Sequence, residues 1–247
     1  MNLLSFPILK RLYPSIVRRY LMLIGKNKIN INISNFIFEI DIRESIERKT
    51  YFLREYEKKR IDKLSQLSKK INSDTLIDIG ANIGFYSIIL SNKFEKIYSF
   101  EPNKRNFQVL RKNIEINDLK NIKIFNFGLG ENKEILIGTS NTKGKLFQTS
   151  GFAVSKDNSI GEKVLIEKGD DFLKFNNKSI TIKIDVEGFE YFVLKEINKI
   201  LSNNNCLVQI EIWEKNNSKI QKFFKLLDYK LICSIDGDTY FSNIILN

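Results

Sequence analysis

The stretch TLIDIGANIGFYS, residues 75–87, decides the fold of this chain. An apolar run that contains Asp78 leads into two glycines, Gly80 and Gly84, and a second apolar run follows directly. In a parallel sheet, the turn between the first strand and its helix lies at the ligand crevice, and glycine lets the backbone approach a ligand closely. The stretch therefore predicts a strand, a ligand-binding turn and a helix in succession.

The spacing of the glycines limits the kind of ligand. A dinucleotide fingerprint needs glycine where Asn82 stands, and the sequence has no phosphate-binding P-loop. The remaining pattern, D-x-G-x-x-x-G, suits a ligand that lacks a pyrophosphate and has a cationic end for Asp78 to face. S-adenosylmethionine, with its ammonium, sulfonium and adenosine groups, has these properties. A tight turn that binds no ligand is the alternative at this point.

From residue 75 on, strand-like and helix-like segments alternate. Their continuous apolar strands indicate a parallel sheet with helices on both faces, and the last two segments predict an antiparallel hairpin. We therefore expect an α/β, Rossmann-like fold with a mostly parallel, seven-stranded sheet. The expected strands cover 75–79, 96–100, 121–127, 180–186, 206–213, 229–235 and 239–246, and the expected helices cover 83–92, 103–117, 188–203 and 217–228.

The first 70 residues follow other patterns. Residues 1–28 predict one or two short helices, interrupted at Pro7 and Pro14. Alternating apolar residues over 28–42 predict a small hairpin, and helical spacing over 43–71 predicts a helix that is broken once.

Residues 131–170 interrupt the alternation of strands and helices, because they are polar and contain only short apolar runs. A structureless loop of this length is rare in a compact domain, so we expect small strands added at the carboxyl edge of the sheet, where substrates bind. The expected organisation is an N-terminal segment, 1–70, packed on a domain of residues 71–247 that carries this insertion on its substrate side.

The basic residues concentrate at the N-terminus of a chain whose net charge is +11. Residues 1–28 contain no acid and six basic residues, namely Lys10, Arg11, Arg18, Arg19, Lys26 and Lys28. They suit a patch for anionic lipid or another polyanion, and the alternative is the solvated face of a helix packed on the domain. No apolar stretch reaches the roughly 20 residues of a membrane span, and no signal-peptide pattern occurs. We expect a cytoplasmic protein, with peripheral membrane contact through 1–28 left open.

Two residue types limit the chemistry. The chain contains no histidine, which excludes a Ser-His-Asp triad, a histidine-ligated zinc and a histidine general base. Any proton acceptor is then Asp, Glu, Tyr, Lys or solvent. Cys206 and Cys233 lie in apolar, strand-like runs and are expected to be buried thiols in a reducing compartment.

The second strand, in YSFEPN, ends at Glu101, which follows Gly80 by 21 residues. An acid at about this separation accepts hydrogen bonds from both ribose hydroxyls of a bound nucleoside. A surface glutamate at a strand end is the alternative, and the glycine turn in register with it favours the ribose.

A third group of polar residues lies in IKIDVEGFE. Lys183, Asp185 and Glu187 alternate along a strand and its exit, so they are expected to share one face. Charged residues inside a central strand are costly unless they are paired, and a buried salt bridge is therefore one interpretation. Their position at a strand tip favours a catalytic or substrate-holding cluster. Glu211 and Glu214, near the end of the next strand, extend this acidic rim and are expected to bind substrate.

Four segments occur in a characteristic order and spacing, namely DIGANIGFYS, FEPNKRNFQVLRKNIEIN, GLGENKE and IKIDVEGFEYFVLKE. Together they resemble the FkbM-type S-adenosylmethionine-dependent methyltransferases. The resemblance covers about residues 29–246. It implies a class I methyltransferase sheet and O-methylation of a hydroxyl on a sugar, a glycan or another small metabolite. Where the chain has GLGEN, the family more often has an Ala-Leu-Gly-Asp pattern.

The resemblance also implies roles for individual residues. Asp185 and Glu187 would face the reacting centre, and Glu101 would bind the ribose. The methionine end would lie at the glycine turn, and the adenine near 127–130. The residues expected to bind the cofactor are Asp78, Gly80, Ala81, Asn82, Gly84, Phe85, Tyr86, Glu101, Pro102, Asn103, Phe127 and Gly128.

Methyl transfer of this kind is an in-line displacement, in which the enzyme holds the acceptor oxygen about 3 Å from the methyl carbon. We expect Asp185 or Glu187 to accept the hydroxyl proton, with Lys183 orienting the acid or the acceptor. The acids would also suit Mg²⁺, a role that the sequence leaves open. The favoured acceptor is a sugar of a surface polysaccharide, and the oligomeric state is open.

Two other functions remain. A nucleic-acid methyltransferase of the base-amino type needs a [DNS]-P-P-[YF] turn where DVEG stands, and the cytosine-C5 type needs a Pro-Cys pair that the sequence lacks. These absences argue against nucleic acid as the acceptor, although the basic net charge leaves a 2′-hydroxyl RNA methyltransferase open. The other alternative is a non-catalytic binding module with the methyltransferase fold, against which the intact acids and glycines argue.

Overall fold

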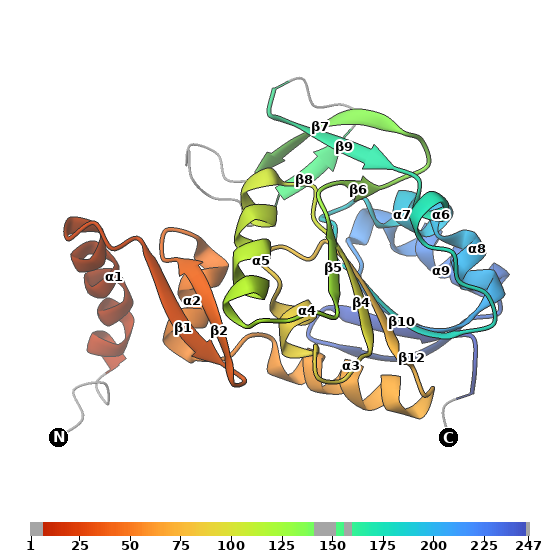
Figure 1. Ribbon diagram of the computed structural model, residues 1–247, viewed down its shortest axis with the longest axis horizontal. Helices are drawn as coiled ribbons and strands as arrows, with labels where there is room; N and C mark the ends of the chain where they lie inside the picture. Colours follow the sequence, from red (N-terminus) through yellow and green to blue (C-terminus); the bar gives the residue numbers. More distant parts are fainter. Residues whose placement is uncertain (1–6, 141–151, 156–159, 246–247) are drawn as a thin grey trace.

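The computed structural model describes residues 7–140, 152–155 and 160–245 (Figure 1). Its centre is a seven-stranded sheet with the strand order β12-β13-β11-β10-β3-β4-β5. β13 is antiparallel to both of its neighbours, and the other neighbouring pairs are parallel. The strands are β3 (Thr75–Ile79), β4 (Lys96–Phe100), β5 (Ile122–Phe125), β10 (Ser179–Ile184), β11 (Asn205–Glu211), β12 (Lys230–Ile235) and β13 (Asp238–Ser242).

The predicted α/β fold with a mostly parallel, seven-stranded sheet is confirmed. The C-terminal hairpin is present, and Asp236 and Gly237 make its turn in the left-handed region, with φ of 50° and 99°. Its second strand does not lie at the edge of the sheet. β13 is inserted between β12 and β11, so the antiparallel strand is one place in from the edge.

Helices cover both faces of the sheet (Figure 1). On one face lie α3 (Lys58–Lys70), α4 (Phe85–Ile89) and α5 (Lys104–Ile116), and on the other lie α7 (Glu190–Glu196), α8 (Asn198–Asn203) and α9 (Asn217–Leu226). The expected helix over 83–92 is shorter than predicted because the turn extends to Gly84, which caps α4. The expected helix over 188–203 is divided at Ile197 into α7 and α8.

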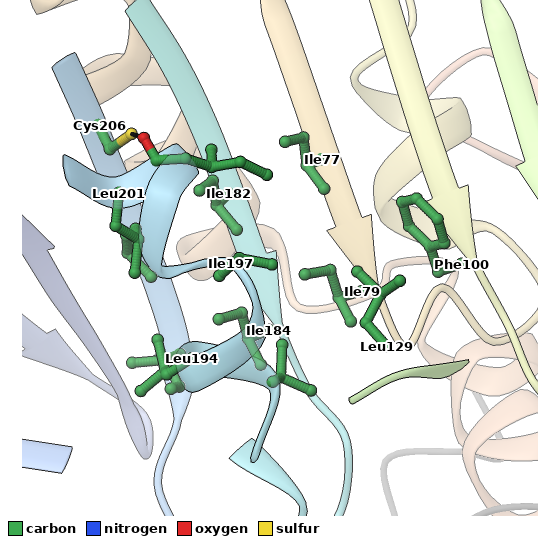
Figure 2. Close-up of a cluster of buried hydrophobic side chains, with 14 of the residues drawn as sticks. Ile77, Ile79, Phe100, Leu129, Ile182, Ile184, Leu194, Ile197, Leu201 and Cys206 are labelled. Atoms are coloured by element: carbon green, nitrogen blue, oxygen red, sulfur yellow. Dashed lines mark hydrogen bonds between the residues drawn. The ribbon is translucent and has the colours of Figure 1, made fainter. Parts of the chain in front are cut away.

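The apolar core follows from the alternation of side chains along each strand. Figure 2 shows one cluster, which contains Ile77, Ile182 and Cys206 of three neighbouring strands together with Leu194 and Leu201 of the helices. Full burial of one such side chain contributes about 1.5–3 kcal/mol to the free energy of unfolding. The Cys206 thiol is buried as predicted, with Sγ 3.7 Å from the carbonyl oxygen of Ile200, whereas Cys233 is only half-buried because β12 is an edge strand.

The N-terminal helix α1 (Pro7–Leu23) runs without a break through Pro14, so the predicted interruption there is wrong. Proline has a helical φ, and it removes only one backbone hydrogen bond when the helix continues around it. Pro7 stands at the first position of the helix, where its missing N–H has no helical partner to lose.

The predicted hairpin and the broken helix that follows it are both confirmed. β1 (Lys28–Ile33) pairs with β2 (Phe36–Asp41) across Ser34 and Asn35, which have positive φ as a two-residue hairpin turn requires. The helix is divided into α2 (Ser45–Leu53) and α3 by left-handed residues at Arg54 and Glu57.

Residues 128–167 supply a second, smaller sheet with the order β6-β9-β7-β8, as the sequence predicted for 131–170. Its strands are β6 (Gly128–Leu129), β7 (Glu134–Ser140), β8 (Phe152–Ser155) and β9 (Glu162–Glu167), and α6 (Gly169–Phe172) follows. The part of the prediction that falls on 141–151 and 156–159 lies outside the described residues. Because β6 follows directly on β5, this sheet lies over the carboxyl ends of the central strands (Figure 1).

Candidate active site

A cavity opens at the carboxyl ends of β3, β4, β10 and β11, beneath the small sheet. Most of the residues that the sequence singled out line this one cavity. They are Gly80, Ala81, Asn82, Phe85, Tyr86, Glu101, Pro102, Gly128, Lys183, Asp185, Glu187 and Glu211. Segments more than 100 residues apart in the chain therefore meet here, because neighbouring parallel strands end at the same edge of a sheet.

Three predicted cofactor residues lie behind the cavity wall. Asp78 is fully buried under the turn, and Gly84 packs against Leu110 at the start of α4. Asn103 is buried at the N-cap of α5, where its side chain accepts a hydrogen bond from the Asn106 amide. These residues support the wall and do not line the cavity.

Two other predicted residues lie further away. Phe127 packs in an aromatic group with Phe100, Phe125 and Phe172 and does not line the cavity. Glu214, which the sequence assigned to substrate binding, is exposed on the short 3-10 helix η2 (Glu214–Asn216). Glu211, at the end of β11, is the member of that pair that reaches the cavity.

The turn after β3 leaves no room for a side chain at Gly80. A Cβ atom built there would lie 1.8 Å from the carbonyl oxygen of Asp185, and the φ of Gly80 is 86°. The sequence suggested glycine for the approach of a ligand. The structure adds that the backbone after β10 lies directly against Gly80. The glycine therefore allows the turn after β3 to pack on the turn that carries Asp185 and Glu187.

Glu101 is held firmly at the end of β4. One carboxylate oxygen accepts the backbone N–H of Asn82 and the other accepts that of Asn103, both at 2.8 Å. Burial raises the pKa of Glu101 to about 7. Each oxygen keeps a second lone pair, so this carboxylate is oriented to accept two hydroxyl groups of a ligand.

The small sheet supports the same acid indirectly. The carboxylate of Glu162, at the start of β9, accepts hydrogen bonds from Asn103 Nδ2 at 3.0 Å and from the backbone N–H of Lys104 at 3.2 Å. Asn103 in turn holds Glu101. No sequence pattern identifies Glu162, because this acid meets α5 only through the fold of the inserted sheet.

A row of polar side chains crosses the middle of the sheet. In register, Gln209 of β11, Lys183 of β10, Asp78 of β3 and Ser99 of β4 are neighbours. Ser87 Oγ donates to Asp78 Oδ2 at 2.5 Å, and Lys183 Nζ lies 4.0 Å from Asp78 Oδ1. Burial raises the pKa of Asp78. The acid in this row compensates the positive charge of Lys183, whose burial inside the sheet would otherwise destabilise the fold.

Lys183 also holds Asp185, whose Oδ2 atom lies 3.2 Å from Nζ. Burial alone would raise the pKa of Asp185, but the lysine and a hydrogen bond with Glu211 outweigh it and the pKa is lowered. Burial and the charge of Asp185 raise the pKa of Glu211 to about 8. Asp185 is therefore the ionised member of this pair at neutral pH.

Glu187 differs from Asp185 in its surroundings. It lines the cavity in the left-handed conformation, with φ of 53°, and makes no hydrogen bond or ion pair with any other described residue. Burial, together with the charges of Asp185 and Glu190, raises its pKa to about 7. A carboxyl group that is unpaired and titrates near neutrality is suited to accept a proton.

The opposite wall comes from residues that the sequence analysis missed. Tyr56, Glu57 and Arg60, around the start of α3, line the cavity. Tyr86 donates a hydrogen bond to Glu57 at 2.9 Å, and Arg60 pairs with Glu57 at 3.1 Å and with Asp238 at 3.3 Å. In the sequence these residues lie in an ordinary charged helical pattern, which does not distinguish them from a solvated face.

The small sheet completes the lining with apolar side chains. Phe152, Val154 and Ile166 face the cavity from β8 and β9. The alternation of β9 indicates a buried face but not what that face covers, so only the tertiary structure identifies these contacts.

Neither a metal cluster nor a membrane span emerges from the described part of the chain. Within 7–140, 152–155 and 160–245, no group of three or more Asp, Glu or Cys side chains is arranged to hold a metal ion. No helix of those residues is long and apolar enough to cross a membrane.

Comparison with known families gives one decisive match. The model of the methyltransferase FkbM domain matches residues 78–234, which is more than half of the chain. The chain belongs to the FkbM methyltransferase family. This confirms the predicted family and, with it, the prediction of an S-adenosylmethionine-dependent methyltransferase. The sheet order described above confirms the predicted class I methyltransferase fold.

Two solved structures illustrate what this member of the FkbM family is similar to. A methyltransferase FkbM from Methylobacillus flagellatus KT has 21% identity and a TM-score of 0.47, over 69% of this chain and 43% of that protein. M. jannaschii TYW2 in complex with AdoMet has 12% identity and a TM-score of 0.45, over 87% of this chain and 84% of that protein. The chain thus spans less than half the length of the first of these. A search of curated proteins gives no match.

Proposed function

We propose that this methyltransferase transfers the methyl group of S-adenosylmethionine to a hydroxyl group of a sugar, a glycan or another small metabolite, with Glu187 as the general base. The observation that carries the proposal is the unpaired Glu187 carboxyl in the cavity, beside a carboxylate that is already bound to lysine. The favoured acceptor, a sugar of a surface polysaccharide, rests on the resemblance of the sequence motifs alone.

The residues of the cavity fit the donor. Glu101 suits the ribose, because its carboxylate is buried and held by two backbone amides with lone pairs left over. Pro102, Leu129 and Ile166 offer apolar surface for an adenine next to it. When bound, S-adenosylmethionine supplies a methyl group that is activated by its sulfonium.

Proton removal is the part of the reaction that the chain itself performs. Methylation of a hydroxyl releases one proton, and Glu187 accepts it in the proposed reaction. Its pKa of about 7 means that it is ionised in a large fraction of molecules at neutral pH and still basic enough to take the proton. Asp185 is the weaker base, because Lys183 stabilises its ionised form.

Asp185 and Glu211 then have a positioning role in this proposal. Glu211, with its pKa raised to about 8, keeps its proton at neutral pH and shares it with Asp185. Because the one proton of Glu211 is donated to Asp185, the pair presents acceptor oxygens to the cavity, to which the hydroxyl groups of a polyol acceptor can donate. Lys183 fixes the geometry of the pair through its contact with Asp185.

The test compares Glu187→Gln with Asp185→Asn and with Glu214→Gln, an exposed acid on η2 that serves as the control. Donor binding is measured by calorimetry, and turnover is measured by transfer of a tritiated methyl group onto a panel of nucleotide sugars. We expect Glu187→Gln to lower kcat by about 10²–10⁴-fold with donor affinity unchanged. In the wild type, kcat should rise with pH through about 7, since the base must be ionised.

Three results would contradict the proposal. Near-normal turnover by Glu187→Gln would exclude it as the base. Labelling of RNA, with salt-dependent binding, in place of any sugar would assign the 2′-hydroxyl alternative. Donor binding without transfer to either class of acceptor would favour the non-catalytic binding module.

A further inference from the structure

The helix α1 carries an apolar stripe that the rest of the described chain does not cover. Ile16, Tyr20 and Leu23 follow one another at intervals of four and three residues, so they lie along one side of the helix. Their exposed fractions are 60%, 60% and 86%. In Figure 1 the helix lies at the far end of the molecule, beyond the β1–β2 hairpin.

A different side of α1 faces the domain. Val17, Arg18 and Leu21 are half-buried. Arg18 lies near Arg48 of α2, and its charge, together with burial, lowers the pKa of Arg48. The alternative that the sequence left open was the solvated face of a helix packed on the domain. The helix does pack through Val17 and Leu21, but its other side exposes an apolar stripe and not only basic residues.

The charge around the stripe limits what can cover it. α1 has no acid in its first turn, and the six basic residues of 1–28 are joined by no acid at all. Arg19 is exposed one residue before Tyr20, and Lys26 and Lys28 follow the helix. A second copy docked through this face would bring two such basic segments together, whereas an anionic surface would meet them with opposite charge.

We propose that α1 docks this protein on the surface of an anionic lipid bilayer. Ile16, Tyr20 and Leu23 enter the boundary between headgroups and acyl chains, and Arg19 with Lys26 contacts lipid phosphates. The helix lies in the plane of the membrane surface, since its 17 residues include two adjacent arginines. The docking is independent of the methyl acceptor and of the role of Glu187.

The test is cosedimentation of the full chain with two kinds of vesicle, one of phosphatidylcholine alone and one of equal parts phosphatidylcholine and phosphatidylglycerol. We expect binding to the anionic vesicles to be at least about tenfold tighter, and to weaken as salt is added. The triple variant Ile16→Ser, Tyr20→Ser, Leu23→Ser should lose at least about tenfold in affinity for them, because its stripe no longer enters the bilayer.

A matched variant controls for a general loss of apolar surface. This second triple variant combines Ile135→Ser, Leu226→Ser and Leu231→Ser, which remove exposed apolar side chains from β7, α9 and β12. It should bind vesicles like the wild type. Arg19→Gln should weaken binding only to the anionic vesicles. Circular dichroism establishes that each variant is folded.

Three outcomes would overturn the proposal. Equal affinity of the wild type for both kinds of vesicle would remove the role of the basic residues. Unchanged vesicle binding by the stripe variant would remove the role of the apolar side chains. If sedimentation instead finds a wild-type dimer that the stripe variant converts to monomers, without vesicle binding, a second copy covers the face and the membrane proposal is wrong.

Discussion

The two walls of the cavity differ in how the chain specifies them. One wall consists of the strand ends, with Gly80, Glu101 and Glu187 each within a few residues of the end of a parallel strand. The other is a cover, made by Tyr56 near α3 and Phe152 of the small sheet. The strand-end wall is fixed by local turns and by strand register, whereas long-range packing alone brings the cover into place. A sequence motif therefore predicts the chemistry of a site where strand register determines which residues lie next to the motif.

The largest expected effect tests the strand-end wall at its tightest contact. Gly80→Ala would place a Cβ against the Asp185 carbonyl oxygen and impose positive φ on alanine. We expect the free energy of unfolding to fall by more than about 4 kcal/mol and donor binding to be lost with it. Urea unfolding and calorimetry measure the two effects.

Gly25→Ala is the matched control for that substitution. Gly25 also has positive φ, at 71°, but a Cβ there meets no atom within 4 Å. Its cost should be about 1–2 kcal/mol, from backbone conformation alone. Equal losses for the two variants would mean that the approach to Asp185 contributes nothing.

The next effect concerns the polar row beneath the same wall. Lys183→Met leaves Asp78 and Asp185 without their cation, so the free energy of unfolding at neutral pH should fall by about 3–5 kcal/mol. Part of this loss should be recovered on acidification, because the carboxylates can then be neutral. Lys195→Met, which breaks the exposed pair with Glu131, should cost less than about 1 kcal/mol. If the Lys183→Met protein is as stable as that control, the polar row does not contribute to the free energy of unfolding.

Substitutions in the small sheet of the cover should affect donor binding more than stability, because this sheet supports Glu101 through Asn103. Glu162→Gln weakens the hold on Asn103, and we expect a roughly tenfold loss of donor affinity with about 1 kcal/mol of stability. Glu167→Gln, on the same strand but paired with Lys133, should leave donor affinity unchanged. Calorimetry on both variants distinguishes support of Glu101 from a general loosening of β9.

The last expected effect is a pH dependence that arises from the acids of the strand-end wall. The pKa values of Glu101 and Glu187 are raised to about 7, and that of Glu211 to about 8, each with burial as the largest cause. Raised carboxyl pKa values give stability that is full below the unfolded pKa and is lost as pH rises through 7–8. The ligand-free protein should therefore resist urea better near pH 5 than near pH 9. Glu187→Gln with Glu211→Gln should flatten this dependence, and an unchanged slope would contradict the burial of these acids.

The sequence predicted the strand-end wall well, for a physical reason. Strands with continuous apolar runs must pair in a buried sheet, and their carboxyl ends then share one edge, which brings Glu101 and Asp185 together from distant segments. The least successful expectations were those that needed side-chain direction. Asp78 was expected to face a ligand but is buried beneath the turn, and Glu214 was expected at the rim but is exposed on η2.

The cover was beyond sequence reasoning for an equally physical reason. Arg60 acts at the cavity through Glu57 and through Asp238, which lies 178 residues further along the chain. No local periodicity encodes a pairing at that separation. The inserted sheet was predicted as strands, but Phe152 and Ile166 could be assigned to the cavity only once their faces were known.

The insertion of β13 between β12 and β11 has a consequence for synthesis on the ribosome. Until residues 238–242 have emerged, β11 exposes an unpaired edge and β12 has no neighbour to join. Asp238 on that strand also supplies the partner of Arg60. A nascent chain therefore completes its sheet and this part of its cavity in the same step, since one strand both covers the open edge of β11 and supplies Asp238.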